Sequence, residues 1–220
     1  MKRLLLLCAA IPPFIIGCST TTYDRGDSAA KSLQNAAAEV QIEKRELTFT
    51  MNALDSLVSK PAVDLRPQFK QFSGNLDRLE TSARRNDKAA EVASQKNVAY
   101  LQSWDRQLTN MNYEVIRERS ETRRTQVAEN FNAVDRRYTE ARAAMQPLLS
   151  YLNDIRRALD SDLTVSGIKS IKPVVANAQD NARKVQSALG KLSDELANAG
   201  AKVSPVVTQT ASNPTNVAGH

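Results

Sequence analysis

Histidine and cysteine are almost absent from this 220-residue chain. The one histidine is the last residue, His220, and the two cysteines, Cys8 and Cys18, lie near the amino terminus. A side chain at the end of a chain is poorly suited to the fixed geometry that a catalytic base or a metal ligand needs. The sequence also has no glycine-rich phosphate loop, no HExxH and no GxSxG motif. We therefore predict that the protein is not an enzyme and has no catalytic residue, metal or cofactor.

Glycine, proline and aromatic residues are also scarce. The chain has 7 Gly and 8 Pro, its aromatic content is 5%, and neither Gly nor Pro occurs in residues 75–146. Folds with many tight turns need these two residues, because they supply the backbone conformations that turns require. The composition therefore favours long helices, and the low aromatic content argues against a thick core.

Apolar residues recur at alternating steps of three and four along four segments of the chain. This spacing puts them in a stripe on one face of a helix, and its persistence is typical of coiled-coil packing. We predict an all-α fold of long antiparallel helical hairpins, or a coiled-coil bundle of three to four helices. Many stripe positions are alanine and two are Asn86 and Asn97, so the predicted seam is thin. The stripes cover residues 33–58, 69–115, 127–159 and 168–199.

The polar segment 117–126, RERSETRRTQ, interrupts the second and third stripes. A helix could continue through it, so that residues 64–162 form one helix on the order of 150 Å long, with the first and last helices folded back on it. Alternatively, the chain could turn within residues 117–125 and form a compact four-helix bundle. Good helix formers and the lack of Gly and Pro favour the continuous helix.

The amino-terminal segment has the features of a secretory signal peptide. Lys2 and Arg3 precede an uncharged apolar run, residues 4–16, which contains Pro12 and Pro13. A run of this length is too short to cross a hydrocarbon core, which takes roughly 20 helical residues. A charged start, a short apolar core and a small residue at its end predict that residues 1–17 are a signal peptide.

The end of this segment, Ile15-Ile16-Gly17-Cys18, resembles a bacterial lipobox, although Ile16 stands where Ala or Ser is commoner. The resemblance implies transfer of diacylglycerol to the Cys18 thiol, cleavage between Gly17 and Cys18, and acylation of the new amino terminus. Two or three acyl chains suffice for stable anchoring to a membrane. In enterobacterial lipoproteins, a residue other than Asp after the cysteine, here Ser19, implies sorting to the outer membrane. We expect a protein of the bacterial cell envelope, anchored by lipid on Cys18 and facing the periplasm.

The predicted mature chain, residues 18–220, divides into a coiled-coil helical domain, residues 18–200, and a tail, residues 201–220. The tail has one charged residue, two prolines and no apolar stripe, so we predict that it is disordered. With Cys8 removed and Cys18 acylated, the mature chain would have no free thiol for a disulfide or a nucleophile.

Basic residues raise the question of acidic partners. The net charge is +6 and falls to +4 once Lys2 and Arg3 are removed with the signal peptide. Such charge could attract acidic envelope polymers or lipids, yet acidic residues are interleaved with it, which is typical of a solvated helix face. No aromatic residues alternate with the basic ones, so we expect no nucleic-acid binding. Eight of the arginines form four adjacent pairs, at 84–85, 123–124, 136–137 and 156–157.

As a whole, the chain resembles bacterial helical lipoproteins that are catalogued only as a domain of unknown function and predicted to form coiled coils. The resemblance implies no activity and no catalytic residue. We expect a lipid-anchored periplasmic helical rod that acts as a structural, tethering or interaction protein of the envelope, with a protein partner or self-association through the coiled coil. The alternative is a chaperone-like module, or one that binds envelope polymers or lipids, using a basic helical hairpin. A clamp of that kind needs an exposed apolar inner face, whereas a tether needs its apolar residues paired.

Overall fold

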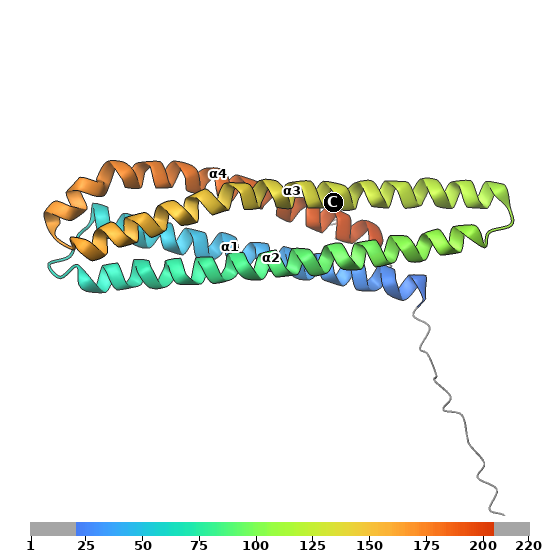
Figure 1. The fold of residues 1–220 in the computed structure, drawn as a ribbon, viewed down its shortest axis with the longest axis horizontal. Helices are drawn as coiled ribbons and strands as arrows, with labels where there is room; N and C mark the ends of the chain where they lie inside the picture. The colour runs from blue at the N-terminus through green and yellow to red at the C-terminus, as the bar shows by residue number, and fades with distance from the viewer. Residues whose placement is uncertain (1–20, 205–220) are drawn as a thin grey trace, which may run out of the picture.

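The computed structural model describes residues 21–204, which form four long helices and contain no strand. Consecutive helices run in opposite directions along an elongated bundle (Figure 1). The predicted all-α fold of antiparallel helical hairpins is thus confirmed. The helices are α1 (Thr22–Ser59), α2 (Arg66–Thr109), α3 (Glu114–Ser161) and α4 (Val165–Val203).

Local sequence signals explain where two of the helices begin. Thr21 caps α1: its Oγ1 accepts a hydrogen bond from the Asp24 backbone N–H at 3.1 Å, and Asp24 Oδ2 accepts one from the Thr21 backbone N–H at 2.9 Å. This reciprocal pair is a capping box, which satisfies two backbone donors at the helix start. At the start of α4, Thr164 Oγ1 accepts a hydrogen bond from the Gly167 backbone N–H at 3.1 Å.

Gly167 also allows the tight connection between α3 and α4. A Cβ atom at this position would lie 2.2 Å from the backbone oxygen of Asp162, closer than real Cβ atoms approach. Any larger residue would therefore force the backbone of the turn to move.

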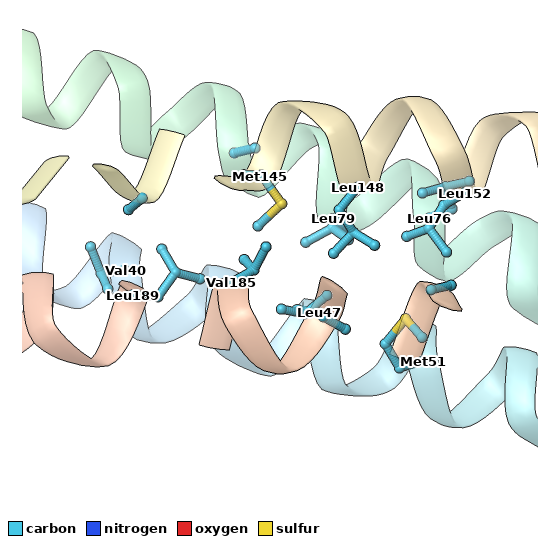
Figure 2. Packing of buried hydrophobic residues seen from close by; sticks show 14 of the residues in the cluster. Val40, Leu47, Met51, Leu76, Leu79, Met145, Leu148, Leu152, Val185 and Leu189 are labelled. Carbon is cyan, nitrogen blue, oxygen red and sulfur yellow. The ribbon is translucent and has the colours of Figure 1, made fainter. Parts of the chain in front are cut away.

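The hydrophobic core runs along the bundle and takes side chains from all four helices. Figure 2 shows Leu47 of α1, Leu79 of α2 and Leu148 of α3 close together in the interior of the bundle. Leu189 of α4 lies farther along the same core. Each fully buried side chain of this size contributes roughly 1.5–3 kcal/mol relative to exposure. Most predicted stripe positions are buried, so the stripes are confirmed as the core-facing sides of the helices. The largest fully buried side chains are Phe72, Leu33, Leu47, Leu54, Leu57, Leu76, Leu79, Leu148, Leu152, Leu159, Leu189 and Leu192.

The prediction of one continuous helix over residues 64–162 is wrong. The chain reverses at residues 110–113, NMNY, and residues 117–126 are helical within α3. The alternative turn within residues 117–125 is therefore misplaced, although its outcome, a four-helix bundle, is correct. Asn110 ends α2, with its backbone N–H bonded to the carbonyl of Gln107, and Tyr113 is extended before α3. Asparagine forms turns without glycine or proline because its short side chain bonds to nearby backbone; Asn110 Nδ2 donates to the Arg106 carbonyl at 3.1 Å.

Two smaller boundaries also differ from expectation. Val115 was predicted to lie in the seam, but it is 64% exposed because the chain has already turned before it. The helical domain extends three residues beyond position 200, since α4 ends at Val203. The rest of the predicted tail, from residue 205, lies outside the described residues.

The helices form a closed ring in the order α1, α2, α3, α4, in which each packs against its two neighbours and α2 and α3 are the least closely packed pair. The connections 60–65 and 162–164 lie at one end of the bundle, and the connection 110–113 lies at the other (Figure 1). At that second end the hairpin of α2 and α3 projects beyond the first turn of α1 and the last turn of α4. We call residues 104–123 of this hairpin the tip.

Hydrogen bonds show how the helix ends are staggered. Thr22 at the start of α1 lies beside Ser103 of α2, with 2.6 Å between the two hydroxyl oxygens. Lys202 near the end of α4 lies beside Asn130 of α3, with its Nζ 2.8 Å from Asn130 Oδ1. Six residues of α2, 104–109, therefore continue past the start of α1 and cover about 9 Å at 1.5 Å per residue.

Candidate functional site

The residues that the sequence singled out as sites lie outside the part of the chain that the structure describes. Gly17 and Cys18, the predicted cleavage and lipidation positions, precede residue 21. The lipid anchor therefore stays a prediction. Three features of the described bundle are candidates for function: a buried polar pair, an open groove and the exposed apolar tip.

The buried polar pair joins α1 to α2 in the middle of the bundle. Asn86 Nδ2 donates a hydrogen bond to Glu43 Oε2 at 2.6 Å, and the two residues are 4% and 3% exposed. Burial disfavours the charged carboxylate and raises the pKa of Glu43 to about 7, against the opposing effect of the Asn86 hydrogen bond; the nearby charge of Asp87 raises it further. Glu43 thus titrates near neutral pH inside the apolar seam.

A second set of polar groups lies beside this pair. The Tyr138 hydroxyl of α3 donates to Asp87 Oδ1 of α2, and Arg142 Nε lies 3.9 Å from the same oxygen. Burial, together with the hydrogen bond to Asp87, holds the pKa of Tyr138 well above its usual range. Glu43, Asp87, Tyr138 and Arg142 also line one small internal cavity of about 10 Å³, so the buried pair and this set are neighbours.

An open groove of about 690 Å³ lies outside this cavity, between α2 and α3. It follows the least closely packed pair of helices. Its charged residues are of both signs, and burial raises the pKa of one of them, Asp135. A groove with this balance offers hydrogen bonds and ion pairs without a bias toward one sign of ligand. Its lining residues are Arg84, Asp87, Lys88, Ala90, Glu91, Ser94, Asp135, Tyr138, Thr139 and Arg142.

Four of the eight arginines that occur in adjacent pairs form ion pairs. Arg124 reaches Asp105 on the neighbouring helix at 2.8 Å, and Arg156 reaches Asp77 at 2.6 Å. Arg137 and Arg157 each pair at 2.8 Å and 2.7 Å with a carboxylate three residues along their own helix. Positive and negative charges are thus interleaved at these positions of the described surface.

The tip carries a group of exposed apolar side chains. Tyr113 is 77% exposed, Val115 is 64% exposed and Ile116 is 58% exposed. At the base of the tip, α2 and α3 are joined by the Trp104 indole N–H, which donates to Ser120 Oγ at 2.9 Å, and by the Asp105–Arg124 ion pair. The tip is therefore a supported hairpin with apolar residues at its end.

Within residues 21–204, no group of three or more His, Cys, Asp or Glu side chains is placed to hold a metal ion. No described helix is both long enough and apolar enough to cross a membrane.

Sequence reasoning found one half of the buried polar pair and missed the other. Asn86 stood out as a polar residue in an apolar stripe, but Glu43 is one of many glutamates on a charged helix. Only the register of α1 against α2, which the sequence does not state, places Glu43 opposite Asn86.

Fold and site together define an antiparallel four-helix bundle with a polar pair in its core and an extended hairpin at one end. The chain belongs to the family described as "Protein of unknown function (DUF2959)", whose model matches residues 20–203 and so covers all four helices. No curated protein and no solved structure matches it.

Proposed function

We propose that the protein is a lipid-anchored helical scaffold of the bacterial cell envelope, held to the outer membrane by acyl chains on Cys18 and facing the periplasm. The observation that carries this proposal is that the apolar stripes are paired with one another. Leu33, Phe72, Leu148 and Leu192, one from each helix, are all nearly inaccessible to solvent. A closed core gives a stiff rod, which suits a tether or spacer.

The same observation argues against a chaperone-like clamp. A clamp would need to present an apolar inner face to its client, and exposing the seam of this bundle would mean separating helices that bury their large side chains together. The mixed charge of the groove likewise gives no preference for acidic polymers or lipids. A partner protein, or a second copy of the chain, would dock on the charged outer faces of the bundle.

Hydrophobic dye binding tests this choice. A scaffold with a closed core should leave the fluorescence of an apolar dye close to its value in buffer. The variant Leu76→Asp places a charge in the core and should open the bundle, so its dye fluorescence should rise and supply the positive control. Strong dye binding by the wild-type chain at neutral pH would instead support the clamp. Crosslinking the acylated protein in intact envelopes, followed by its isolation, would then identify the partner that a scaffold requires.

A further inference from the structure

The exposed apolar residues of the tip are concentrated, whereas those elsewhere on the described chain are scattered. Tyr113, Val115 and Ile116 lie within four consecutive positions that end one helical connection and begin α3. At the opposite end of the bundle, Val63 on the connection 60–65 and Val165 at the first position of α4 are exposed singly. A group of exposed apolar side chains at one end of a rod indicates a site that contacts another surface.

The start of α1 lies at the same end of the bundle as the tip (Figure 1). Thr22 is level with Ser103, so the last residue of α2 lies about 9 Å farther along the axis. Cys18 precedes Thr22 by four residues, which together span at most about 14 Å even when fully extended. If Cys18 lies at a bilayer surface and the bundle stands upright, the tip is within a few ångströms of that surface.

The opposite orientation is not compatible with this short connection. α1 has 38 residues and is about 57 Å long, so the end of the bundle that holds Val63 cannot stand on the bilayer while Thr22 stays close to Cys18. The anchor therefore allows only orientations in which the tip lies near the membrane, with the bundle upright or tilted.

The chemistry of the tip favours lipid as its partner. A tyrosine has an apolar ring with a polar hydroxyl and suits the boundary between headgroups and acyl chains, and Val115 and Ile116 add apolar surface. Charges in the tip are balanced, since residues 104–123 contain four arginines and four carboxylates. Contact would therefore depend on apolar insertion and only weakly on anionic lipid.

We propose that the tip of the α2–α3 hairpin inserts Tyr113, Val115 and Ile116 into the interface of the membrane that holds the lipid on Cys18. This contact and the acyl chains form two separate attachments at one end of the rod. The inference rests on the proposed lipid anchor. Because the tether keeps the tip close to the bilayer at a high effective concentration, a small apolar surface suffices to orient the bundle.

The test uses residues 18–220, which contain all four helices and a single thiol, Cys18. Coupling this thiol to a maleimide phospholipid anchors the chain whether or not a cell acylates it. The vesicles contain phosphatidylethanolamine, phosphatidylglycerol and a phosphatidylcholine brominated near the headgroup end of its acyl chains, which quenches tryptophan. The reporter is Tyr113→Trp in a Trp104→Phe background, and the control reporter is Val63→Trp in the same background. Circular dichroism verifies that both remain helical.

We expect quenching of the Tyr113→Trp reporter to be several-fold stronger than that of the Val63→Trp reporter, and to be nearly the same at low and high salt. Adding Val115→Ser and Ile116→Ser should remove most of the difference, whereas adding Val165→Ser should not. Equal, weak quenching of the two reporters on anchored, helical protein would overturn the tip contact. Quenching that disappears at high salt would overturn apolar insertion as its basis. Failure of the acylation itself would appear separately, as absence of palmitate label in cells.

Discussion

The amide of Asn86 on α2 donates a hydrogen bond to the carboxyl group of Glu43 on α1, and both side chains are buried in the seam between apolar layers. An ionised carboxylate at such a position costs free energy that an apolar or neutral residue would not. This pair therefore makes the stability of the bundle depend on pH and on the identity of both residues.

We expect the free energy of unfolding to fall as the pH rises through neutrality. The pKa of Glu43 is about 7 in the folded chain against 4.5 as its ordinary value, so the folded state binds the additional proton between these values. The stability that this proton gives is complete below about pH 4.5 and is lost as pH rises through 7, a total of about 3 kcal/mol. Glu43→Gln should abolish this slope and make the chain more stable than wild type at pH 8. Urea unfolding at several pH values measures this, with the exposed Glu129→Gln as the control that should keep the slope.

The two asparagines of the α2 stripe should respond in opposite ways to replacement by leucine. Asn97 is 4% exposed and its Oδ1 has no hydrogen-bond partner among the described residues, so Asn97→Leu should raise the free energy of unfolding by about 1 kcal/mol. Asn86→Leu should lower it by about 1–3 kcal/mol at pH 8, since it leaves the Glu43 carboxylate without its donor. Chemical denaturation of both variants compares them directly, and destabilisation of the same size in each would contradict this difference.

Replacing two glycines of α4 by alanine should also give effects of opposite sign. A Cβ at Gly167 would lie 2.2 Å from the Asp162 carbonyl oxygen, whereas one at Gly190 has no atom within 4 Å. Gly190→Ala should stabilise the chain by about 0.5–1 kcal/mol, the helix-propensity difference between the two residues. Gly167→Ala should lower the melting temperature, because the turn between α3 and α4 must shift. If Gly167→Ala were as stable as Gly190→Ala, the turn would be looser than its geometry indicates.

Small-angle scattering should distinguish the bundle from a long rod. α3 has 48 residues and is about 72 Å long, so residues 18–204 should give a maximum dimension near that length and well below about 150 Å, the length of one helix over residues 64–162. Prolines at Ser120 and Thr122 would disturb only the tip and should change this dimension little. The control Thr139→Pro lies where all four helices pack, and we expect it to destabilise the protein by about 3 kcal/mol or more.

The anchor is tested in cells. Cys18→Ala should remove palmitate labelling and release any processed protein from the membrane, because it removes the thiol that would be acylated. Ser19→Ala is the control and should keep the label. Labelling and membrane retention of Cys18→Ala equal to wild type would show that the lipobox resemblance is misleading.

The sequence predicted the helical segments well because their apolar spacing is regular over many turns. Leu47, Leu76, Leu148 and Leu189 all occupy predicted stripe positions and are buried. The reversal at residues 110–113 was missed because it contains neither glycine nor proline, and because neighbouring Leu108 and Met111 continue the spacing of the stripe. Apolar spacing shows which residues share one face of a helix, but it does not show where the helix ends.

The candidate sites were less predictable, because they depend on distances across the bundle. The groove between α2 and α3 requires Asp87 and Tyr138, far apart in the chain, to face each other. The tip is exposed because α1 begins, and α4 ends, short of it along the bundle axis. Apolar spacing alone does not predict how far one helix extends past its neighbour. Asn86 and Asn97 were polar residues in an apolar stripe, and one of them, Asn86, does contact the buried carboxylate.

The closed ring of helices has a consequence for the order in which the chain folds. Three of its four seams join helices that are consecutive in sequence, so they can form from hairpins with little loss of loop entropy. The seam between α1 and α4 joins the two ends of the fold, as the hydrogen bond from Gln41 to Ser193 illustrates. During synthesis, the α1 side of this seam is made first and stays uncovered until α4 is complete. Leu33, whose Cβ would lie 3.8 Å from a Cβ placed at Gly200 of α4, stays uncovered until this seam closes.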